Sequence, residues 1–440
     1  MNNKKWMAIL LGGIMATSLV APCSVSAAEK TTLTFWHAMG GTNGEVLQQI
    51  VDDFNASQDE IEIKAEYQGT YDDTITKLKA AMQSDSGLPD VCQMYDVGTK
   101  FMYDSGAVIP VEDKFESTGY DKSSVMDVIS SYYTVEGKQY AMPFNVSTPM
   151  LYYNKDVFEA AGLDPETPPT TYDEVLEDAK KIVESGAAPV GYSQAIYGWF
   201  FEQQLAGLGV TYGNNDNGRT EAVTAVDFDS NGGGLKVFDM WKKLYDSGYF
   251  EDYGTTTADT QTAFFSGQVG MIIESTAILK NAVDSSPFEV GTGYLPRIEQ
   301  NDEGGVIIGG GSLWLTDTGN EANEDAAWKF IEYITTPDVQ AKWSMGTGYF
   351  AINEKAYETE DMKAYLKENP NFETAINQLK DSPVNCNTAG VLSGVQTEAR
   401  LTFNEIMPQV YDGKLTTQDA VDQLAASVNK AIENYNESIK

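Results

Sequence analysis

The chain has 440 residues, more than one ordinary folding core accommodates, which suits about two domains. It carries 65 Asp and Glu against 29 Lys and Arg, a formal net charge of −36. This field excludes nucleic acid and anionic membranes as general partners, because both polyanions need basic contacts. A single histidine, His37, and three cysteines exclude a histidine-rich zinc site and a framework of disulfides.

The first 27 residues have the layout of a secretory signal peptide, predicted over 1–27. Lys4 and Lys5 precede an apolar run, and small residues follow it up to Ala27. Two maturation routes remain open. Cleavage after Ala27 gives a soluble protein, whereas LVAPC before Cys23 partly resembles the lipid-attachment box of bacterial lipoproteins. We expect an exported protein in the periplasm, or on the outer face of the cell membrane if Cys23 is lipidated.

Strands and helices alternate after the signal. The patterns predict strands over 32–36, 61–67 and 90–95 and helices over 45–55 and 71–84. Strand, helix, strand with short loops implies parallel pairing by right-handed crossovers. We therefore expect an α/β sheet that presents ligand-binding residues at the carboxyl ends of its strands.

A second α/β series follows a hairpin that turns at 136–138. A strand is predicted over 150–154, and Thr171 and Glu174 form a capping box for a helix that Gly186 ends. The later elements are helices at 232–248 and 259–267, a strand at 268–275, and a helical tail from 401 to 440 that breaks at Asp412 and Gly413, with Thr417 as a cap. The strand-like stretches 290–298 and 304–317 are expected to return to the first domain.

The sequence lacks the residues that most catalytic mechanisms require. Ser/His/Asp or Cys/His catalysis would need His37, and the sequence contains no P-loop, HExxH or GxSxG motif. GNNDNG around Gly218 has no carboxylate at the first or last ligand position of a calcium loop, so we interpret it as a polar loop. We expect no enzyme activity, no cofactor and no metal. Cys92 and Cys386 are either two buried thiols or one disulfide.

Three features at strand ends suit anion binding. Ser275 is placed as a helix N-cap, where its hydroxyl and free backbone N–H groups meet. The glycines at 309–311 interrupt a strand and permit close backbone approach to a ligand. Arg400 is one of few arginines, and a guanidinium binds phosphate or carboxylate through two bonds. Taken singly, each also fits a structural role as a cap, a bulge or a surface ion pair.

Larger motifs occur in one order: FWH, EYQGTYDD, QMYDVGT, PFNVSTPMLYYNKDVFEAAGLDPETPP, IIGGGSLW and TGYFAINEKAY. They resemble the extracellular solute-binding proteins, family 1, of ABC importers over nearly the whole mature chain, and most of all the members that bind sn-glycerol 3-phosphate. The resemblance implies a two-lobed α/β clamp that closes on its ligand, with about three interlobe crossings. It implies one lobe from 28–143 plus 292–345 and the other from 144–291 plus 346–440.

The resemblance also implies the ligand contacts. Six positions have the residue type of the family: Tyr71, Ser147, Ser275, Gly310, Tyr349 and Arg400. Together they would make a phosphate cradle, in which the guanidinium supplies the charge and the others supply neutral donors. Two positions depart from the family pattern. Asp96 replaces a glutamate that grips the glycerol hydroxyls, and Ile196 replaces the first of two tryptophans, which leaves Trp199 alone.

The resemblance therefore implies a substrate-binding component that captures glycerol 3-phosphate or a related glycerophosphodiester and delivers it to membrane permease subunits. We expect it to act as a monomer. Both departures are at positions that would contact the alcohol part of the ligand, whereas the positions that would contact the phosphate match the family. We therefore expect a phosphorylated polyol rather than glycerol 3-phosphate specifically. The alternative is an oligosaccharide-binding component of a carbohydrate importer, for which 24 Tyr and 7 Trp could supply stacking surfaces.

Overall fold

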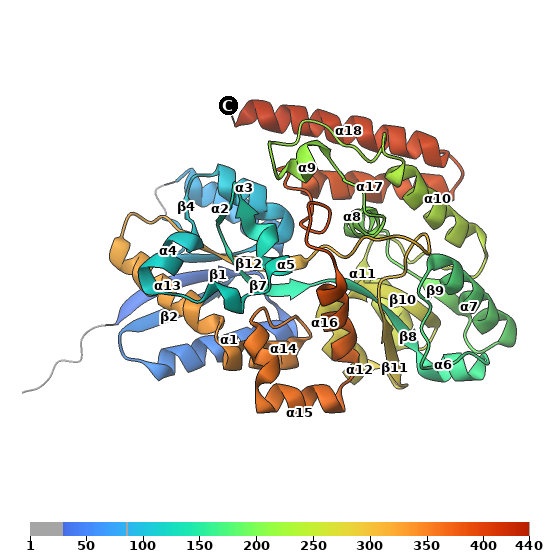
Figure 1. Ribbon diagram of the computed structural model, residues 1–440, viewed down its shortest axis with the longest axis horizontal. Helices are drawn as coiled ribbons and strands as arrows, with labels where there is room; N and C mark the ends of the chain where they lie inside the picture. The colour runs from blue at the N-terminus through green and yellow to red at the C-terminus, as the bar shows by residue number, and fades with distance from the viewer. Residues whose placement is uncertain (1–29, 85–86, 440) are drawn as a thin grey trace, which may run out of the picture.

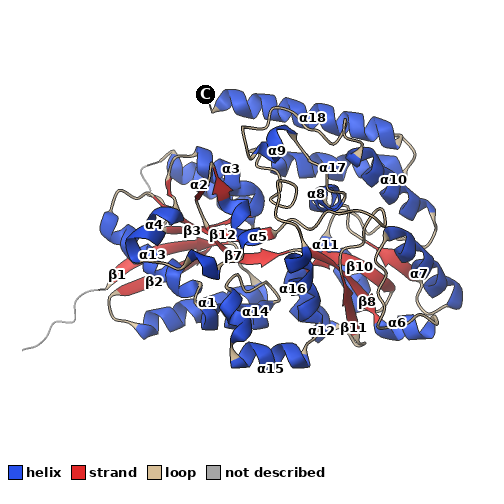
Figure 2. Ribbon diagram, in the orientation of Figure 1, coloured by secondary structure: helices blue, strands red, loops and turns tan. Residues whose placement is uncertain are grey.

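The computed structural model describes residues 30–84 and 87–439 and shows two lobes side by side, each built around a β-sheet (Figure 1). The predicted signal peptide and Cys23 lie outside the described residues. Helices cover the outer faces of both lobes (Figure 2). The sheet of the first lobe has the order β2-β1-β3-β12-β4, with β7 also paired to β12. Its strands are β1 Thr31–His37, β2 Ile61–Tyr67, β3 Val91–Tyr95, β4 Val108–Ile109, β7 Met142–Ser147 and β12 Gly309–Thr316.

The first lobe confirms the predicted parallel core. Strand β1 pairs in parallel with both β2 and β3, and β12 joins antiparallel to β3, β4 and β7. The helices of this lobe are α1 Gly41–Ser57, α2 Tyr71–Met82, α3 Thr99–Asp104, α4 Val111–Thr118, α13 Glu321–Ile334 and α14 Pro337–Thr347. Between them, α5 Asp127–Ser130 precedes the predicted hairpin, β5 Thr134–Val135 and β6 Lys138–Gln139.

The sheet of the second lobe has the order β11-β8-β10-β9. Its strands are β8 Pro149–Asn154, β9 Val190–Ser193, β10 Val269–Ser275 and β11 Val290–Gly293. Its helices are α6 Lys155–Ala160, α7 Tyr172–Ser185, α8 Gly198–Gly207, α9 Asn214–Gly218, α10 Gly233–Asp246, α11 Thr257–Phe265, α12 Leu279–Ser285, α17 Gln396–Tyr411 and α18 Thr417–Ser438. Helices α15 Glu360–Glu368 and α16 Asn371–Asp381 follow α14 of the first lobe and precede α17 of the second lobe in the sequence.

The expectation that residues 290–298 return to the first lobe is wrong. Strand β11 pairs antiparallel with β8, with Val290 opposite Asn154, so it completes the second sheet. The link from α12 is too short to reach the other lobe, and residues 294–308 make the crossing instead. The stretch 309–316, as predicted, forms β12 of the first sheet.

Local helix signals are confirmed with one correction. Thr171 and Glu174 form the predicted capping box of α7, and Gly186 ends that helix in the left-handed conformation. The break before the last helix lies where it was predicted, but Thr416 rather than Thr417 is the cap. The Thr416 hydroxyl accepts a hydrogen bond from the backbone N–H of Asp419, in a capping box. The repeated threonines at 416 and 417 made the register ambiguous by one residue.

The chain crosses between the sheets at Thr148, through 294–308, and again after α14. Thr148 lies between β7 and β8, and its backbone is bonded on both sides to Thr276, its carbonyl accepting from the N–H and its N–H donating to the hydroxyl. The boundary predicted between 143 and 144 falls inside β7, which runs to Ser147. Each lobe has its own buried apolar core. No helix in the described ranges is long and apolar enough to cross a membrane.

Cys92 and Cys386 are free thiols, so the disulfide alternative is not realised. Cys92 is fully buried in β3, and burial raises its pKa to about 12, whereas Cys386 is partly exposed. We expect N-ethylmaleimide to modify Cys386 in the native protein and Cys92 only after unfolding, because the thiolate is the nucleophile. Peptide mass mapping checks this. A Cys92–Cys386 crosslink, or equal labelling of both, would contradict it.

Candidate ligand-binding site

A buried ionic cluster lies where the lobes meet. Arg400 on α17 donates from Nε to Glu202 Oε1 at 2.8 Å and from Nη2 to Glu202 Oε2 at 2.7 Å. The same Nη2 donates to Asp96 Oδ2, from the first lobe, at 2.8 Å. All three side chains are less than 10% exposed. One cation thus bridges two carboxylates from opposite lobes, and the cluster has a net charge of −1.

The charges of this cluster depend on one another. Burial by itself would lower the pKa of Arg400, but the carboxylates of Asp96 and Glu202 outweigh it and hold the pKa well above its ordinary value. Burial raises the pKa of Glu202, although Arg400 opposes the shift. Nη1 of Arg400 has no hydrogen-bond partner among the described residues. The guanidinium therefore keeps two N–H donors for a further acceptor.

An amide network in the first lobe positions Tyr71. Its hydroxyl accepts from Asn145 Nδ2 at 2.7 Å, and Asn145 Oδ1 accepts from Gln93 Nε2 at 2.7 Å. The Tyr71 ring stacks on Tyr95 with centroids 5.2 Å apart. Tyr95 reaches across the lobes, with its hydroxyl 2.5 Å from Thr397 Oγ1, one turn before Arg400. Burial raises the pKa of Tyr71 well above its ordinary value, so the hydroxyl stays protonated as a donor.

Tyr349 lies against the same network. It is 8% exposed, and its ring stacks on Trp343 with centroids 5.6 Å apart. Burial raises the pKa of Tyr349, while Asn145 and Tyr71 lower it through side-chain hydrogen bonding. Tyr349 therefore lies close to Tyr71 and Asn145, whose side chains act on its pKa.

Strands β7 and β12 position Ser147 and Gly310, two of the residues predicted to contact the ligand. Ser147 lies opposite Gly309, and the register shifts between Gly311 and Ser312, which makes the predicted bulge. Gly310 has φ +93°, a conformation that favours glycine. The Trp199 ring packs directly on Gly309, as a side-chain carbon at 309 would lie 2.6 Å from it. Trp199 Nε1 is buried and has no hydrogen-bond partner among the described residues, and its role in ligand contact stays a prediction.

Ser275 caps the turn at the end of β10, as predicted. Its hydroxyl accepts from the backbone N–H of Ala277 at 3.1 Å, and its carbonyl accepts from the Tyr152 hydroxyl at 2.7 Å. The next residue, Thr276, is bonded to Thr148 at the first crossing. Ser275 and Ser147 thus flank one hinge, and a role of Ser275 in ligand contact stays a prediction.

The structure places the predicted residues in three groups: Asp96 and Arg400 form an interlobe ion pair, Tyr71 and Tyr349 lie at Asn145, and Ser147, Ser275, Gly310 and Trp199 lie on or against the strands next to the first crossing. It also adds residues that the sequence analysis missed. Glu202, Gln93, Asn145 and Tyr95 hold the predicted side chains in place. A signal for Glu202 existed, because it is the one charged residue in the apolar run GWFFEQQLAG of α8. The single histidine, His37, is buried at the end of β1, and burial lowers its pKa to about 4.

A buried carboxyl precedes Ser275. Glu274 is 4% exposed and accepts from Gln261 Nε2 at 2.9 Å and from the Ser275 N–H at 2.7 Å. Burial raises its pKa from 4.5 to about 7, although these hydrogen bonds oppose the shift. No ion pair joins Glu274 to a cation among the described residues.

Glu274 is expected to make stability fall as pH rises. Between pH 4.5 and about 7 the folded protein retains a proton that the unfolded chain has lost, so the free energy of unfolding decreases through this window. Glu274→Gln should flatten this decline and raise stability near pH 8 by roughly 2 kcal/mol. Chemical denaturation of both proteins across the window checks it. An identical pH slope in the variant would contradict the assignment.

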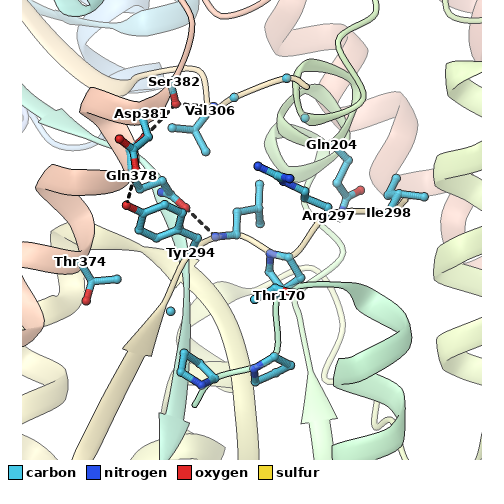
Figure 3. Close-up of a pocket in the computed structure, with 18 of the residues that line it drawn as sticks. Thr170, Gln204, Tyr294, Arg297, Ile298, Val306, Thr374, Gln378, Asp381 and Ser382 are labelled. Atoms are coloured by element: carbon cyan, nitrogen blue, oxygen red, sulfur yellow. Dashed lines mark hydrogen bonds between the residues drawn. The ribbon is translucent and has the colours of Figure 1, made fainter. Parts of the chain in front are cut away.

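A separate cavity of about 550 Å³ is lined by the crossing segment after β11, the loop before α7, the end of α8 and helix α16 (Figure 3). None of the eight predicted residues lines it. The interlobe cluster and this cavity are therefore different sites.

Comparison with known proteins identifies the family. The family model described as a bacterial extracellular solute-binding protein matches residues 49–374. The sn-glycerol-3-phosphate-binding periplasmic protein UgpB of Escherichia coli K12 is 31% identical over 417 residues, covering 93% of this chain and 94% of its own length. UgpB of Shigella dysenteriae serotype 1 is 30% identical over 420 residues, with the same coverage.

Two solved structures have the same architecture. UgpB of Mycobacterium tuberculosis in complex with glycerophosphocholine has a TM-score of 0.79 at 20% identity, over 92% of this chain and 99% of that one. The cyclic alpha-maltosyl-1,6-maltose binding protein of Arthrobacter globiformis has a TM-score of 0.75 at 26% identity, over 92% and 100%. These proteins bind different classes of ligand. The chain therefore belongs to the bacterial extracellular solute-binding proteins and is the substrate-binding protein of an ABC importer rather than an enzyme.

Proposed function

We propose that the protein captures glycerol 3-phosphate or, in preference, a related glycerophosphodiester between its lobes and delivers it to the membrane permease subunits. The main support for this proposal is Arg400, a buried arginine at the seam between the lobes. Its Nη1 group has no hydrogen-bond partner among the described residues. A phosphate oxygen in reach of Nη1 would accept a charge-assisted bond without displacing either carboxylate.

The neutral donors complete this cradle. Tyr71, Tyr349 and Trp199 supply buried hydroxyl and indole donors, and Ser147, Ser275 and the Gly310 backbone lie on the strands around the first crossing. Because both lobes contribute, an ordered ligand contacts both lobes only when the clamp is closed. The ligand would then shift the equilibrium between open and closed forms by its difference in affinity for them.

Charge favours a diester over a monoester. The cluster of Arg400, Asp96 and Glu202 is already negative by one unit, and a phosphate monoester brings nearly two further negative charges into a buried site. A phosphodiester brings one negative charge, and burying it beside the cluster costs less free energy. Ile196, where the family resemblance implies a tryptophan, is fully buried in the core of the second lobe.

The second candidate is an oligosaccharide. The stacked rings of Tyr71 and Tyr95 and the buried indole of Trp199 could stack on sugar faces, and a cyclic maltosyl-maltose binding protein shares the fold. Sugar hydroxyls could accept a hydrogen bond from Arg400 Nη1 and donate to Asp96 and Glu202, but a neutral sugar would bring no charge to the guanidinium. The anion-binding interpretation uses more of the observed groups.

Isothermal titration calorimetry separates the candidates. The mature protein is titrated with glycerophosphocholine, glycerol 3-phosphate and maltose, and each ligand is analysed afterwards for breakdown. We expect saturable heat with glycerophosphocholine, weaker or equal heat with glycerol 3-phosphate, and none with maltose. Saturable heat with maltose alone would replace the proposal by the oligosaccharide function.

A further inference from the structure

The cavity of about 550 Å³ has the size of a small-molecule site. Figure 3 shows Tyr294, Gln378 and Asp381 on one wall and Gln204, Arg297 and Ile298 on the other. Two prolines before α7, the end of α8, the crossing segment after β11 and helix α16 complete the lining. The apolar part of the wall comes from prolines and aliphatic side chains: Pro168, Pro169, Leu295, Ile298 and Val306.

Most polar groups of the cavity wall are already hydrogen-bonded. Gln378 accepts from the Leu295 N–H at 2.5 Å and donates to the Pro149 carbonyl at 2.7 Å. The Tyr294 hydroxyl donates to Asp381 Oδ2 at 2.7 Å. These bonds fix α16 against the crossing segment, so the cavity is preformed.

Arg297 is the exception. Its backbone is anchored, since its N–H donates to the Thr170 carbonyl and its carbonyl accepts from the Tyr172 N–H, both at 2.9 Å. Its side chain is exposed at the rim of the cavity, and its guanidinium has no ion pair and no hydrogen bond among the described residues. Burial raises the pKa of Asp302, and the charge of Arg297 is the smallest of the effects that lower it. The guanidinium donors of Arg297 are therefore available to a ligand in the cavity.

We propose that this cavity binds a small amphipathic monocarboxylate, with its carboxylate on Arg297 and its apolar part against the proline and aliphatic wall. A guanidinium binds a carboxylate through two parallel N–H bonds, which fixes the orientation of the ligand. Asp381 in the opposite wall and the negative field of the whole protein disfavour a dianion. The cavity and the predicted interlobe site share no lining residue.

Benzoate and its neutral analogue benzamide are suitable probes, titrated into the full mature protein and followed by saturation-transfer NMR. We expect saturable benzoate binding and at least about tenfold weaker benzamide binding, since a charge-assisted bond is lost. Arg297→Gln should weaken benzoate by about the same factor. Lys430→Gln on the exposed face of α18 removes the same charge elsewhere and should leave binding unchanged.

A second variant fills the cavity without touching Arg297. Gly207 lines the cavity at the end of α8, and a side-chain carbon placed there meets no heavy atom within 4 Å. Gly207→Leu is therefore expected to fold normally, which circular dichroism checks, and to abolish benzoate binding. Absence of saturable binding to the wild-type protein would overturn the proposal. So would benzoate binding that survives unchanged in either Arg297→Gln or Gly207→Leu.

Discussion

Arg400→Ala is expected to abolish measurable binding of the phosphate ester and to destabilise the protein. The substitution removes the only cation among the described residues that is bonded to Asp96 and Glu202, which leaves two buried carboxylates facing each other across the seam. Removing one partner of a buried ion pair typically costs about 3–5 kcal/mol. Loss of the charge-assisted bonds to the ligand should weaken its affinity by about a hundredfold or more. Calorimetry and chemical denaturation measure the two effects.

The charge mechanism makes this result depend on pH. Burial raises the pKa of Glu202 and Arg400 opposes this shift, so without Arg400 the pKa of Glu202 rises further and the folded variant takes up a proton that the unfolded chain releases. The stability deficit of the variant should therefore be smaller at about pH 5 than at about pH 8. Lys414→Ala, which removes an exposed cation paired with Asp412, is the matched control and should change stability by less than about 1 kcal/mol. A deficit independent of pH would contradict the charge mechanism.

Gly310→Ala is expected to destabilise the protein by about 4 kcal/mol or more, because two costs add. The backbone at 310 has φ +93°, which is strained for alanine, and a side-chain carbon there would lie 1.9 Å from the Asn145 carbonyl oxygen. Strands β12 and β7 would have to separate. Asn145 would move with β7, so the Tyr71 hydroxyl would lose its donor and ligand affinity should fall as well.

Gly319→Ala separates the two costs. Gly319 has φ +70°, and a side-chain carbon there meets nothing within 4 Å, so only the backbone strain applies. We expect that variant to lose about 1–2 kcal/mol and to keep full ligand affinity. Thermal unfolding and calorimetry of both variants check the difference. Equal losses in the two variants would show that the close approach of β7 to Gly310 is unimportant.

Local patterns predicted most of the individual elements. The apolar periods of 45–55 and 61–67 gave α1 and β2, and the capping box of Thr171 with Glu174 placed α7 to the residue. The assignment of 290–298 to the first lobe was wrong. The four residues of β11, VGTG, contain no signal that shows which of the two sheets the strand joins. That choice depends on the length of the link from α12 and on the free edge of β8.

The sequence analysis named candidate ligand contacts but not the residues that hold them in place. Arg400, Ser275 and the glycines at 309–311 were singled out by their rarity and position, and the family resemblance supplied Tyr71 and Tyr349. The partner of Arg400 was not predictable, because Glu202 is 198 residues away and reaches it only through the packing of α8 on α17. The pairing with Asp96 likewise depends on how the two lobes meet.

A crystal structure of the mature protein grown with glycerophosphocholine would show whether the ligand binds at the interlobe seam on Arg400. We expect density for the ligand between the lobes, with a phosphate oxygen in hydrogen-bond reach of Arg400 Nη1 and further bonds to Tyr71, Tyr349 or Trp199. Ligand density in the cavity beside Arg297 with an empty seam, or a phosphate held without contact to Arg400, would contradict this expectation.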